Sequence, residues 1–221
     1  EADAERLQEA LIEAGFTQQH EKCAWRYTSL IDLRHSHQEI LLSFNSTTRY
    51  KVRRALRDGI AVRCDRQQED IAVFYKLFQE MWERKGHPCR YSLSFFEQLR
   101  DRLMVFNAFS ATGAPLASAV VLNDGLTARY TWGASAYRPG AAAPLVHYQA
   151  MLWAKNQGLR YYDMGGIPHE PKDQHLKGIK FVKEGFRGRQ IKQLDSITLV
   201  FKPILYEAIN FVRSNYRNVV E

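Results

Sequence analysis

The 221-residue sequence is poor in cysteine and has no long apolar run. Its three cysteines, Cys23, Cys64 and Cys89, lie far apart and form no C-x-x-C pair. An odd, scattered set argues against a disulfide framework and fits a reducing compartment. No run of about 18 apolar residues occurs, so the sequence predicts no membrane-spanning helix. We therefore expect a cytoplasmic protein.

Several catalytic signatures are also missing. The chain has no G-x-S-x-G element, no cysteine–histidine pair that suggests a dyad, no P-loop and no dinucleotide-binding G-x-G-x-x-G. The polar residues Asp163, His169, Asp173 and His175 match no zinc signature, so we interpret them as ordinary loop residues. We therefore expect no covalent nucleophile, no metal and no cofactor.

Basic residues exceed acidic ones by 31 to 24, which gives a formal net charge of +7. That balance fits a polyanionic partner such as RNA, a nucleotide diphosphate or an anionic membrane surface. The first residues are Glu-Ala-Asp rather than Met or a signal peptide. We therefore expect a piece of a longer protein.

The densest basic stretch, residues 47–58, predicts a helix with five cations from Arg49 to Arg57. Arg49, Arg53 and Arg57 follow an i, i+4, i+8 spacing and share one stripe. Like charges four residues apart destabilise a helix by about 0.2–0.5 kcal/mol per pair, and an anion held across the stripe would relieve that cost. We give equal weight to a solvated face and a phosphate-contacting face. The predicted buried side consists of Val52, Ala55 and Leu56.

The order of predicted elements indicates an α/β (α+β) fold. Three meander strands are followed by a helix, a strand, a helix and a strand, which predicts a mixed, mostly antiparallel sheet flanked by helices on both faces. This is the element order of the GNAT-type acyltransferase fold. We expect one GNAT-like domain over 1–221, in which 1–102 leads into a site-bearing core, 103–221. The predicted helices are 3–14, 36–44, 47–58, 70–85, one from 94 onward, 144–157 and one from Pro203. The helices 3–14, 36–44 and 94 onward each have a cap or capping box at their start. The predicted strands lie within 16–33, 60–63, 104–111, 116–122, 126–133, 159–164 and 190–201.

The stretch from Asp163 to Gly188 carries the best candidate site. An acid ends a predicted strand, and Gly165-Gly166 allow a ligand close to the backbone. A helix follows in which Lys177, Lys180 and Lys183 recur every three residues, beside an apolar side. A solvated lysine face is the commoner pattern, but interior glycines cost ~1 kcal/mol each and weigh against it. A lysine here could stabilise the oxyanion formed when an amine attacks an ester, or hold a phosphate. The apolar side consists of Leu176, Ile179 and Val182, and the glycines are Gly178, Gly185 and Gly188.

The sequence resembles the Fem family of aminoacyl-tRNA-dependent aminoacyltransferases, which extend the peptide bridges of peptidoglycan. Matches run in order through most of the chain, and their spacing together is fairly specific. They comprise Leu42 and Phe44 leading to Arg49-x-x-Val52-Arg53-x-Ala55 and Gly59, Phe74-Tyr75-x-Leu77 continuing to Arg84, Tyr130-x-x-Gly133-Ala134-Ser135, Pro144 with Tyr148, Ala154-x-x-x-Gly158-x-x-x-Tyr162-Asp163-x-Gly165-Gly166, and Gly178-Ile179-x-x-Val182-Lys183-Glu184-Gly185-Phe186.

The resemblance implies tandem GNAT-like domains, of which this chain holds the second. It implies aminoacyl-tRNA and a peptide acceptor as partners, and neither CoA nor DNA. Lys183 matches the family's functional lysine, although Val182 stands where the family usually has an aromatic residue. Asp163 either orients the acceptor amine or holds the loop, and we weigh these roles equally. The resemblance implies Arg84 and Tyr130 as acceptor-site residues. We also expect Lys180, Gly165 and Gly166 to bind substrate, and Arg49, Arg53, Arg57 and Lys177 to contact tRNA.

Two other classes of function stay open. An acyl-CoA N-acyltransferase would use a glycine-rich turn at a helix start, but the corresponding loop, 138–144, has a poor match and contains Pro144, which lacks an N–H. A non-catalytic module that binds RNA or a cell-wall precursor is the third hypothesis. A variant of the first is an enzyme that acts on a peptide natural product rather than a wall precursor.

Overall fold

The structure is a computed structural model that describes residues 2–18, 27–168, 171, 173–194 and 197–217. The chain divides into two compact units. The core unit is Tyr27–Ile191, and the terminal unit combines Glu1–Arg26 with Lys192–Glu221. The GNAT-like arrangement described below lies in the core unit. The assignment of all of 1–221 to one GNAT-like domain stays a prediction.

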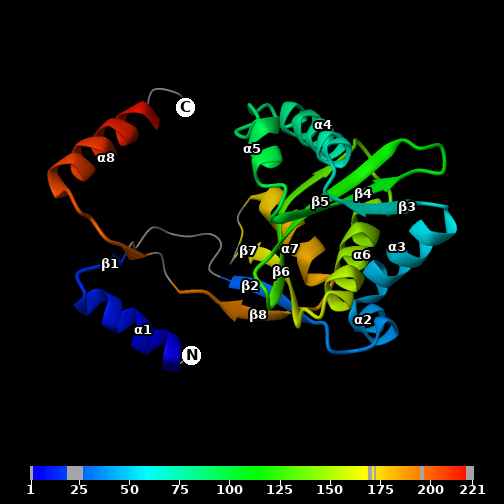
Figure 1. Ribbon diagram of the computed structural model, residues 1–221, viewed down its shortest axis with the longest axis horizontal. Helices are drawn as coiled ribbons and strands as arrows, with labels where there is room; N and C mark the ends of the chain where they lie inside the picture. Colours follow the sequence, from blue (N-terminus) through cyan, green and yellow to red (C-terminus); the bar gives the residue numbers. More distant parts are fainter. Residues whose placement is uncertain (1, 19–26, 169–170, 172, 195–196, 218–221) are drawn as a thin grey trace. The chain divides into compact units, whose positions relative to one another are not determined.

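The core unit is built on a seven-stranded sheet with the order β3-β4-β5-β6-β7-β2-β8 (Figure 1). The predicted meander is confirmed, because β4, β5 and β6 pair antiparallel in sequence order. The strands are β2 (Tyr27–Asp32), β3 (Ala61–Asp65), β4 (Leu103–Phe109), β5 (Pro115–Asn123), β6 (Thr127–Ser135), β7 (Tyr161–Ile167) and β8 (Arg189–Lys192).

The pairing of β6 with β7 is parallel. Strand β6 pairs with β7 through Thr127–Arg129 against Tyr161–Asp163. Past these residues β7 continues beside β2, where Gly166 pairs with Thr28, while β6 continues beside β5. The two strands therefore separate after Arg129 and Asp163, and the separation opens a space within the sheet. Gly165 and Gly166 belong to β7, whereas the sequence predicted that the strand ends before them.

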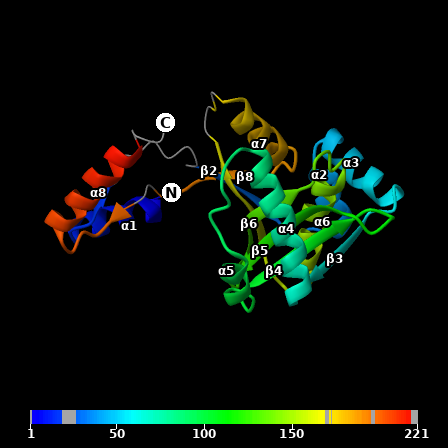
Figure 2. The same ribbon diagram turned by 90° about the horizontal axis from the view of Figure 1, so that it is seen from above.

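Helices cover both faces of the sheet, as predicted (Figures 1 and 2). On one face, α2 (His37–Ser43), α3 (Ser46–Arg57) and α6 (Ala142–Asn156) share a core cluster with Ala119 and Val121 of β5. On the other face, α4 (Gln68–Arg84) and α5 (Leu93–Gln98) pack against Val120. Alternation along a strand places successive side chains on opposite faces, so one strand serves both clusters.

Some helices begin at a capping residue, and three starts differ from the sequence prediction. The helix predicted to begin with a cap at Asp3 starts at Ala2, so Asp3 lies inside it. The capping box of Ser36 and Glu39 opens α2 as predicted. Helix α5, by contrast, is capped by Ser92, which accepts from the Phe95 backbone N–H, and Ser94 lies inside the helix. Pro144 is the third residue of α6 rather than its first, a place where its missing N–H still costs little. The predicted burial of Leu56 is wrong, because its side chain is 50% exposed.

The terminal unit contains α1 (Ala2–Glu13), β1 (Thr17–Gln18), β9 (Ile197–Thr198) and α8 (Pro203–Arg217). Strands β1 and β9 form a two-stranded antiparallel sheet. The predicted strand 190–201 is thus two short strands, β8 and β9. Part of the predicted β-rich segment 16–33 falls on residues 19–26, which lie outside the described residues. Among the described helices, none is long and apolar enough to cross a membrane.

Candidate active site

The separation of β6 and β7 holds a cavity of about 490 Å³, here called the splay cavity. Tyr130 and Met164, the first residues past the parallel pairing, form one side of it. Helix α7 (Gln174–Glu184) forms another, and α6 contributes His147. The cavity therefore lies within the predicted stretch 163–188 and the third meander strand. Its lining consists of Tyr130, His147, Met164, Gln174, Gly178, Ile179, Val182 and Lys183.

Lys183 is the cation of the splay cavity. Its Nζ donates a hydrogen bond to the Gly166 carbonyl at 2.7 Å and lies 5.8 Å from the centroid of the Tyr130 ring. Burial lowers the pKa of Lys183 to about 8, although the nearby Asp163 carboxylate acts in the opposite direction. The ammonium form still dominates at neutral pH, so the cavity contains a positive charge.

The three lysines of α7 do not share one environment as the three-residue spacing predicts. Lys183 is half-buried and points to β7, whereas Lys177 is exposed. Lys180 lies at 3.8 Å from Glu184 in a helical i, i+4 pair. Val182, predicted on the apolar side, is 46% exposed. The helix thus turns Lys183 toward β7, pairs Lys180 with Glu184 and leaves Lys177 exposed.

Asp163 is buried and bonded through both carboxylate oxygens. Its Oδ1 accepts from the Thr28 hydroxyl and from the Gly165 N–H, the latter at 2.8 Å. Its Oδ2 lies 3.3 Å from Nε of Arg129. These contacts tie β2, β6 and β7 together where β6 and β7 begin to separate. A carboxylate with its lone pairs occupied in this way is suited to hold the Gly165 turn.

Two glycines are required where backbone and side chains approach closely. Gly165 has a φ of +73°, and a Cβ there would lie 3.1 Å from the Tyr130 carbonyl oxygen. A Cβ on Gly133 would lie 1.9 Å from the Tyr130 hydroxyl oxygen, so the bare backbone at 133 makes room for that ring. Gly166 supplies the carbonyl that Lys183 binds. The predicted approach of a ligand to Gly165 and Gly166 stays a prediction, whereas the need for Gly133 follows from the fold.

The glycines at 178, 185 and 188 have different structural roles. A Cβ on Gly185 would lie 2.4 Å from the Thr48 hydroxyl, and the Gly185 carbonyl accepts from the Asn45 N–H at 2.9 Å. A Cβ on Gly188 would lie 2.2 Å from the Ser29 hydroxyl. Both residues therefore allow tight packing just after α7. Gly178 has open space around it and lines the splay cavity.

His147 is a site residue that the sequence analysis did not identify. Its side chain is buried, and its Nδ1 lies 3.0 Å from the Tyr162 hydroxyl. The ring makes edge contacts with Tyr130, at a centroid distance of 4.6 Å, and with Phe186, at 5.4 Å. Burial lowers the pKa of His147 to about 3, with a smaller effect of the Lys183 charge. A lone histidine inside an amphipathic helix carries no sequence signal that separates it from a core residue.

The remaining predicted residues lie outside the splay cavity. Arg84, in the last turn of α4, donates from Nη2 to the Ser135 carbonyl at the end of β6. Arg49 donates to the carbonyls of Leu42 and Phe44, so it caps the end of α2 rather than facing solvent freely. Arg53 and Arg57 are exposed. The predicted stripe on α3 therefore has two outward members and one structural member.

A second cavity, here called the basic cavity, has a volume of about 560 Å³ and lies between α3 and the loop before α6. Lys51, Arg54 and Arg138 line it, together with one acid, Asp58, which pairs with Arg54 at 3.3 Å. Arg138 has a φ of +59°, an uncommon conformation for a residue with a side chain. The predicted phosphate contact of Arg49, Arg53 and Arg57 stays a prediction, and the cations that line this cavity are other residues.

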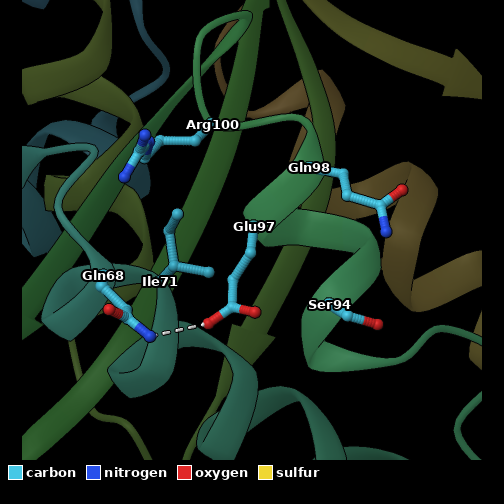
Figure 3. Close-up of a pocket in the computed structure, with 6 residues that line it drawn as sticks. All are labelled: Gln68, Ile71, Ser94, Glu97, Gln98 and Arg100. Atoms are coloured by element: carbon cyan, nitrogen blue, oxygen red, sulfur yellow. Dashed lines mark hydrogen bonds between the residues drawn. The ribbon is translucent and has the colours of Figure 1, made fainter.

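A hollow between α4 and α5 is unrelated to the predicted site. Figure 3 shows Gln68 donating from Nε2 to Glu97 Oε1 at 3.1 Å across it. Gln98, Ser94 and Arg100 complete its polar rim (Figure 3). None of the predicted site residues lines it. Among the described residues, no group of three or more His, Cys, Asp or Glu side chains is arranged to hold a metal ion.

Residues 43–175 match the family described as acetyltransferase (GNAT) domain. The match covers more than half of the chain and spans α3 to the start of α7. The protein therefore belongs to the GNAT family of acyltransferase domains, and the predicted fold class is confirmed.

A narrower placement comes from individual relatives. The chain is 28% identical over 162 residues to the UDP-N-acetylmuramoylpentapeptide-lysine N(6)-alanyltransferase of Weissella viridescens. The alignment covers 70% of this chain and 47% of the relative, so the chain spans about half the length of that relative. This likeness agrees with the resemblance to the Fem family that the motifs predict.

Solved structures agree on the fold. The crystal structure of FemX superimposes with a TM-score of 0.78 at 19% identity, over 92% of this chain and 70% of that chain. L-PGS from Bacillus licheniformis has a TM-score of 0.53 at 15% identity, over 84% of this chain and 69% of that chain. At these identities the likeness concerns the fold alone.

Proposed function

We propose that the protein is an aminoacyltransferase that moves an amino acid from aminoacyl-tRNA to the amine of a peptide acceptor. The acceptor is a peptidoglycan precursor or a similar peptide. The observation that carries the proposal is Lys183, a cation held at 2.7 Å from the Gly166 carbonyl inside the splay cavity. The resemblance to the Fem family and the name of the Weissella viridescens relative support the same reaction class.

The reaction is the aminolysis of an ester. The acceptor nitrogen forms a bond to the ester carbonyl carbon, and the carbonyl oxygen becomes an oxyanion. When this intermediate collapses, the bond to the ribose oxygen breaks, and one proton passes from the nitrogen to that oxygen. The ammonium of Lys183 stabilises the negative charge on the oxyanion or on the departing oxygen, because its hydrogen bond to Gly166 already holds it at the cavity.

Asp163 acts as a positioning residue in this scheme. Its contacts with Thr28, Gly165 and Arg129 favour the loop-holding role over direct contact with the amine. Tyr130 lies beside the Lys183 Nζ, which favours its role in binding the acceptor or the aminoacyl group. The other proposed acceptor residues are Arg84, Lys180, Gly165 and Gly166.

The RNA partner is proposed to bind along the basic face of α3. The cations of the basic cavity, Lys51, Arg54 and Arg138, would contact phosphates, and exposed Arg53 and Arg57 would extend that surface. Lys177 is exposed on α7 and is proposed to contact the same strand near the splay cavity. The net charge of +7 supports such a partner. We place the reaction in the cytoplasm, with peripheral contact at the inner membrane face through the same positive charge.

The test is a transfer assay with the protein, ideally at its full natural length. Charged tRNA and a peptidoglycan precursor are expected to give a new peptide bond, detected by mass spectrometry. Lys183→Ala is expected to abolish most of that product, whereas Lys76→Ala, an exposed lysine on α4, leaves it unchanged. Unchanged turnover in Lys183→Ala would remove the catalytic assignment.

An acyl-CoA N-acyltransferase is the second candidate, favoured by the match to the acetyltransferase domain over residues 43–175. In that reading the basic cavity beside the start of α6 takes a pyrophosphate. Saturable CoA binding by calorimetry, lost in Arg138→Ala, would support it. No CoA binding is expected of a Fem-type enzyme.

A further inference from the structure

His147 is placed to contact whatever occupies the splay cavity. It projects from α6 into the cavity lining next to Lys183 and Tyr130. Its Nδ1 is 3.0 Å from the Tyr162 hydroxyl. Within the described residues, Nε2 has no hydrogen-bond partner. It is also not one of the fully buried polar atoms that lack a partner, so it has some exposure. Nε2 is therefore the ring nitrogen that is open to the splay cavity.

The hydrogen bond to Tyr162 decides which nitrogen holds the proton. The Tyr162 side chain is fully buried, and His147 Nδ1 is the sole partner of its hydroxyl within the described residues. A buried hydroxyl that did not donate its proton would leave a donor unsatisfied, which is rare in folded proteins. Tyr162 therefore donates and Nδ1 accepts. Neutral imidazole carries one proton, so it resides on Nε2.

The surroundings keep the ring neutral. The groups that face it are Lys183, which is cationic, and the neutral hydroxyls of Tyr130 and Tyr162. Phe186 covers another edge. A second positive charge beside Lys183 in this buried place is strongly disfavoured. His147 is thus a fixed neutral donor rather than a base.

We propose that His147 is a further catalytic residue, whose Nε2–H donates a hydrogen bond to the carbonyl oxygen of the aminoacyl ester as that oxygen becomes an oxyanion. The inference rests on the proposed aminoacyl transfer. His147 gains and loses no proton in the step. Lys183 and His147 together supply a charge and a directed dipole to the developing negative charge, an arrangement typical of oxyanion stabilisation.

The protonation state is tested without any activity measurement. Protein labelled with ¹⁵N-histidine gives signals from seven histidines, and His147→Gln identifies the signals of His147 by difference. We expect a protonated Nε2 and an unprotonated Nδ1, unchanged between about pH 5 and pH 8. A proton on Nδ1, or a titration in that range, would overturn the assignment of His147 as a neutral Nε2–H donor.

The catalytic role is tested on kcat with three variants. His147→Phe removes the donor and is expected to lower kcat by about 100-fold with little change in KM. His147→Gln can still present an N–H and is expected to recover a substantial part of that loss. Tyr162→Phe frees Nδ1 to take the proton and is expected to give an intermediate loss. The exposed His35→Gln serves as the control, and thermal melting checks that each variant is folded.

The outcomes separate this inference from the proposed function. If the wild-type protein transfers no amino acid, the proposed function fails while the ¹⁵N result still stands. If the wild-type protein is active and folded His147→Phe keeps kcat within about twofold, the catalytic role is wrong and the proposed function survives. A loss that appears in KM alone would contradict a contact made in the transition state.

Discussion

The splay cavity and the basic cavity both collect positive charge, and they hold it in different ways. At the splay cavity, Lys183 and the buried carboxylate of Asp163, next to the cavity residue Met164, each bind specific backbone or side-chain partners. In the basic cavity three cations line an open surface, and the pair that the structure records there, Arg54 with Asp58, is more than half exposed on both sides.

This difference determines how much a single residue can contribute to stability. A buried polar group whose partner is removed loses its hydrogen bond without gaining water, at a cost of about 1–3 kcal/mol and more for a charge. An exposed pair is worth about 0–1 kcal/mol, because water and salt screen it. We therefore expect single substitutions to have large effects in the splay cavity, whereas the basic cavity acts through the sum of its charges.

The largest expected effect is on stability at acid pH. Burial holds the pKa of His147 at about 3, against 6.5 for an ordinary histidine. Between these values the unfolded chain binds more protons than the folded one, so the free energy of unfolding falls as pH decreases from 6.5 toward 3. This group alone accounts for a loss on the order of 4–5 kcal/mol over that window.

The measurement is urea unfolding at several pH values. His147→Phe is expected to flatten the acid slope, whereas His35→Gln keeps it. An equal slope in wild-type protein and His147→Phe would show that the ring is protonated without penalty and would weaken the contrast between the cavities. The depressed pKa of Lys183 acts in a separate window: stability rises as pH increases from about 8 to 10.5, because the unfolded chain holds its proton longer.

The second effect compares two aspartates, one from each region. Asp163→Ala leaves Thr28, Gly165 and Arg129 without their carboxylate and is expected to destabilise the protein by about 3 kcal/mol. Asp58→Ala breaks an exposed pair and is expected to cost about 0–1 kcal/mol. Denaturant midpoints at pH 7 give both values. Similar losses for the two variants would contradict the proposed difference.

The sequence predicted the sheet, its flanking helices and the stretch that holds Lys183, because strand and helix periodicity and glycine positions are local signals. It could not predict His147, whose role depends on Tyr162 and Tyr130 from two separate strands. The three-residue spacing of Lys177, Lys180 and Lys183 also gave no sign of their different surroundings. Only the packing of α7 against β7 determines that Lys183 alone binds Gly166.

Helix α3 illustrates a second reason why a prediction from sequence spacing can fail. Spacing along α3 grouped Arg49 with Arg53 and Arg57, but Arg49 satisfies the free carbonyls at the end of α2. A helix end needs such partners whatever the charge pattern. The capping error at Ser94 is similar, since Ser92 and Ser94 are both plausible caps two residues apart, and only the backbone geometry chooses between them.

The third effect separates two glycines near the splay cavity. Gly185→Ala drives a methyl group toward the Thr48 hydroxyl and is expected to destabilise the protein by about 1–3 kcal/mol. Gly178→Ala fills open space inside α7 and is expected to stabilise the helix by about 0.5–1 kcal/mol. Thermal melts distinguish the signs. A destabilising Gly178→Ala would mean that the cavity wall needs the bare backbone for packing as well as for ligand access.

The smallest effects per residue are expected on α3, where they are best seen in RNA binding. Arg53→Ala is expected to leave stability unchanged and to reduce the slope of log K against log salt by about 0.7–0.9, as for one lost phosphate contact. Arg49→Ala is expected to do the reverse. It removes the donors to Leu42 and Phe44, costs about 1 kcal/mol of stability and leaves the salt slope intact. Fluorescence anisotropy with tRNA across a salt series, paired with urea unfolding, measures both quantities. Because the two arginines lie on one helix and differ mainly in their partners, equal salt slopes in the two variants would show that capping by Arg49 does not exclude it from the RNA surface.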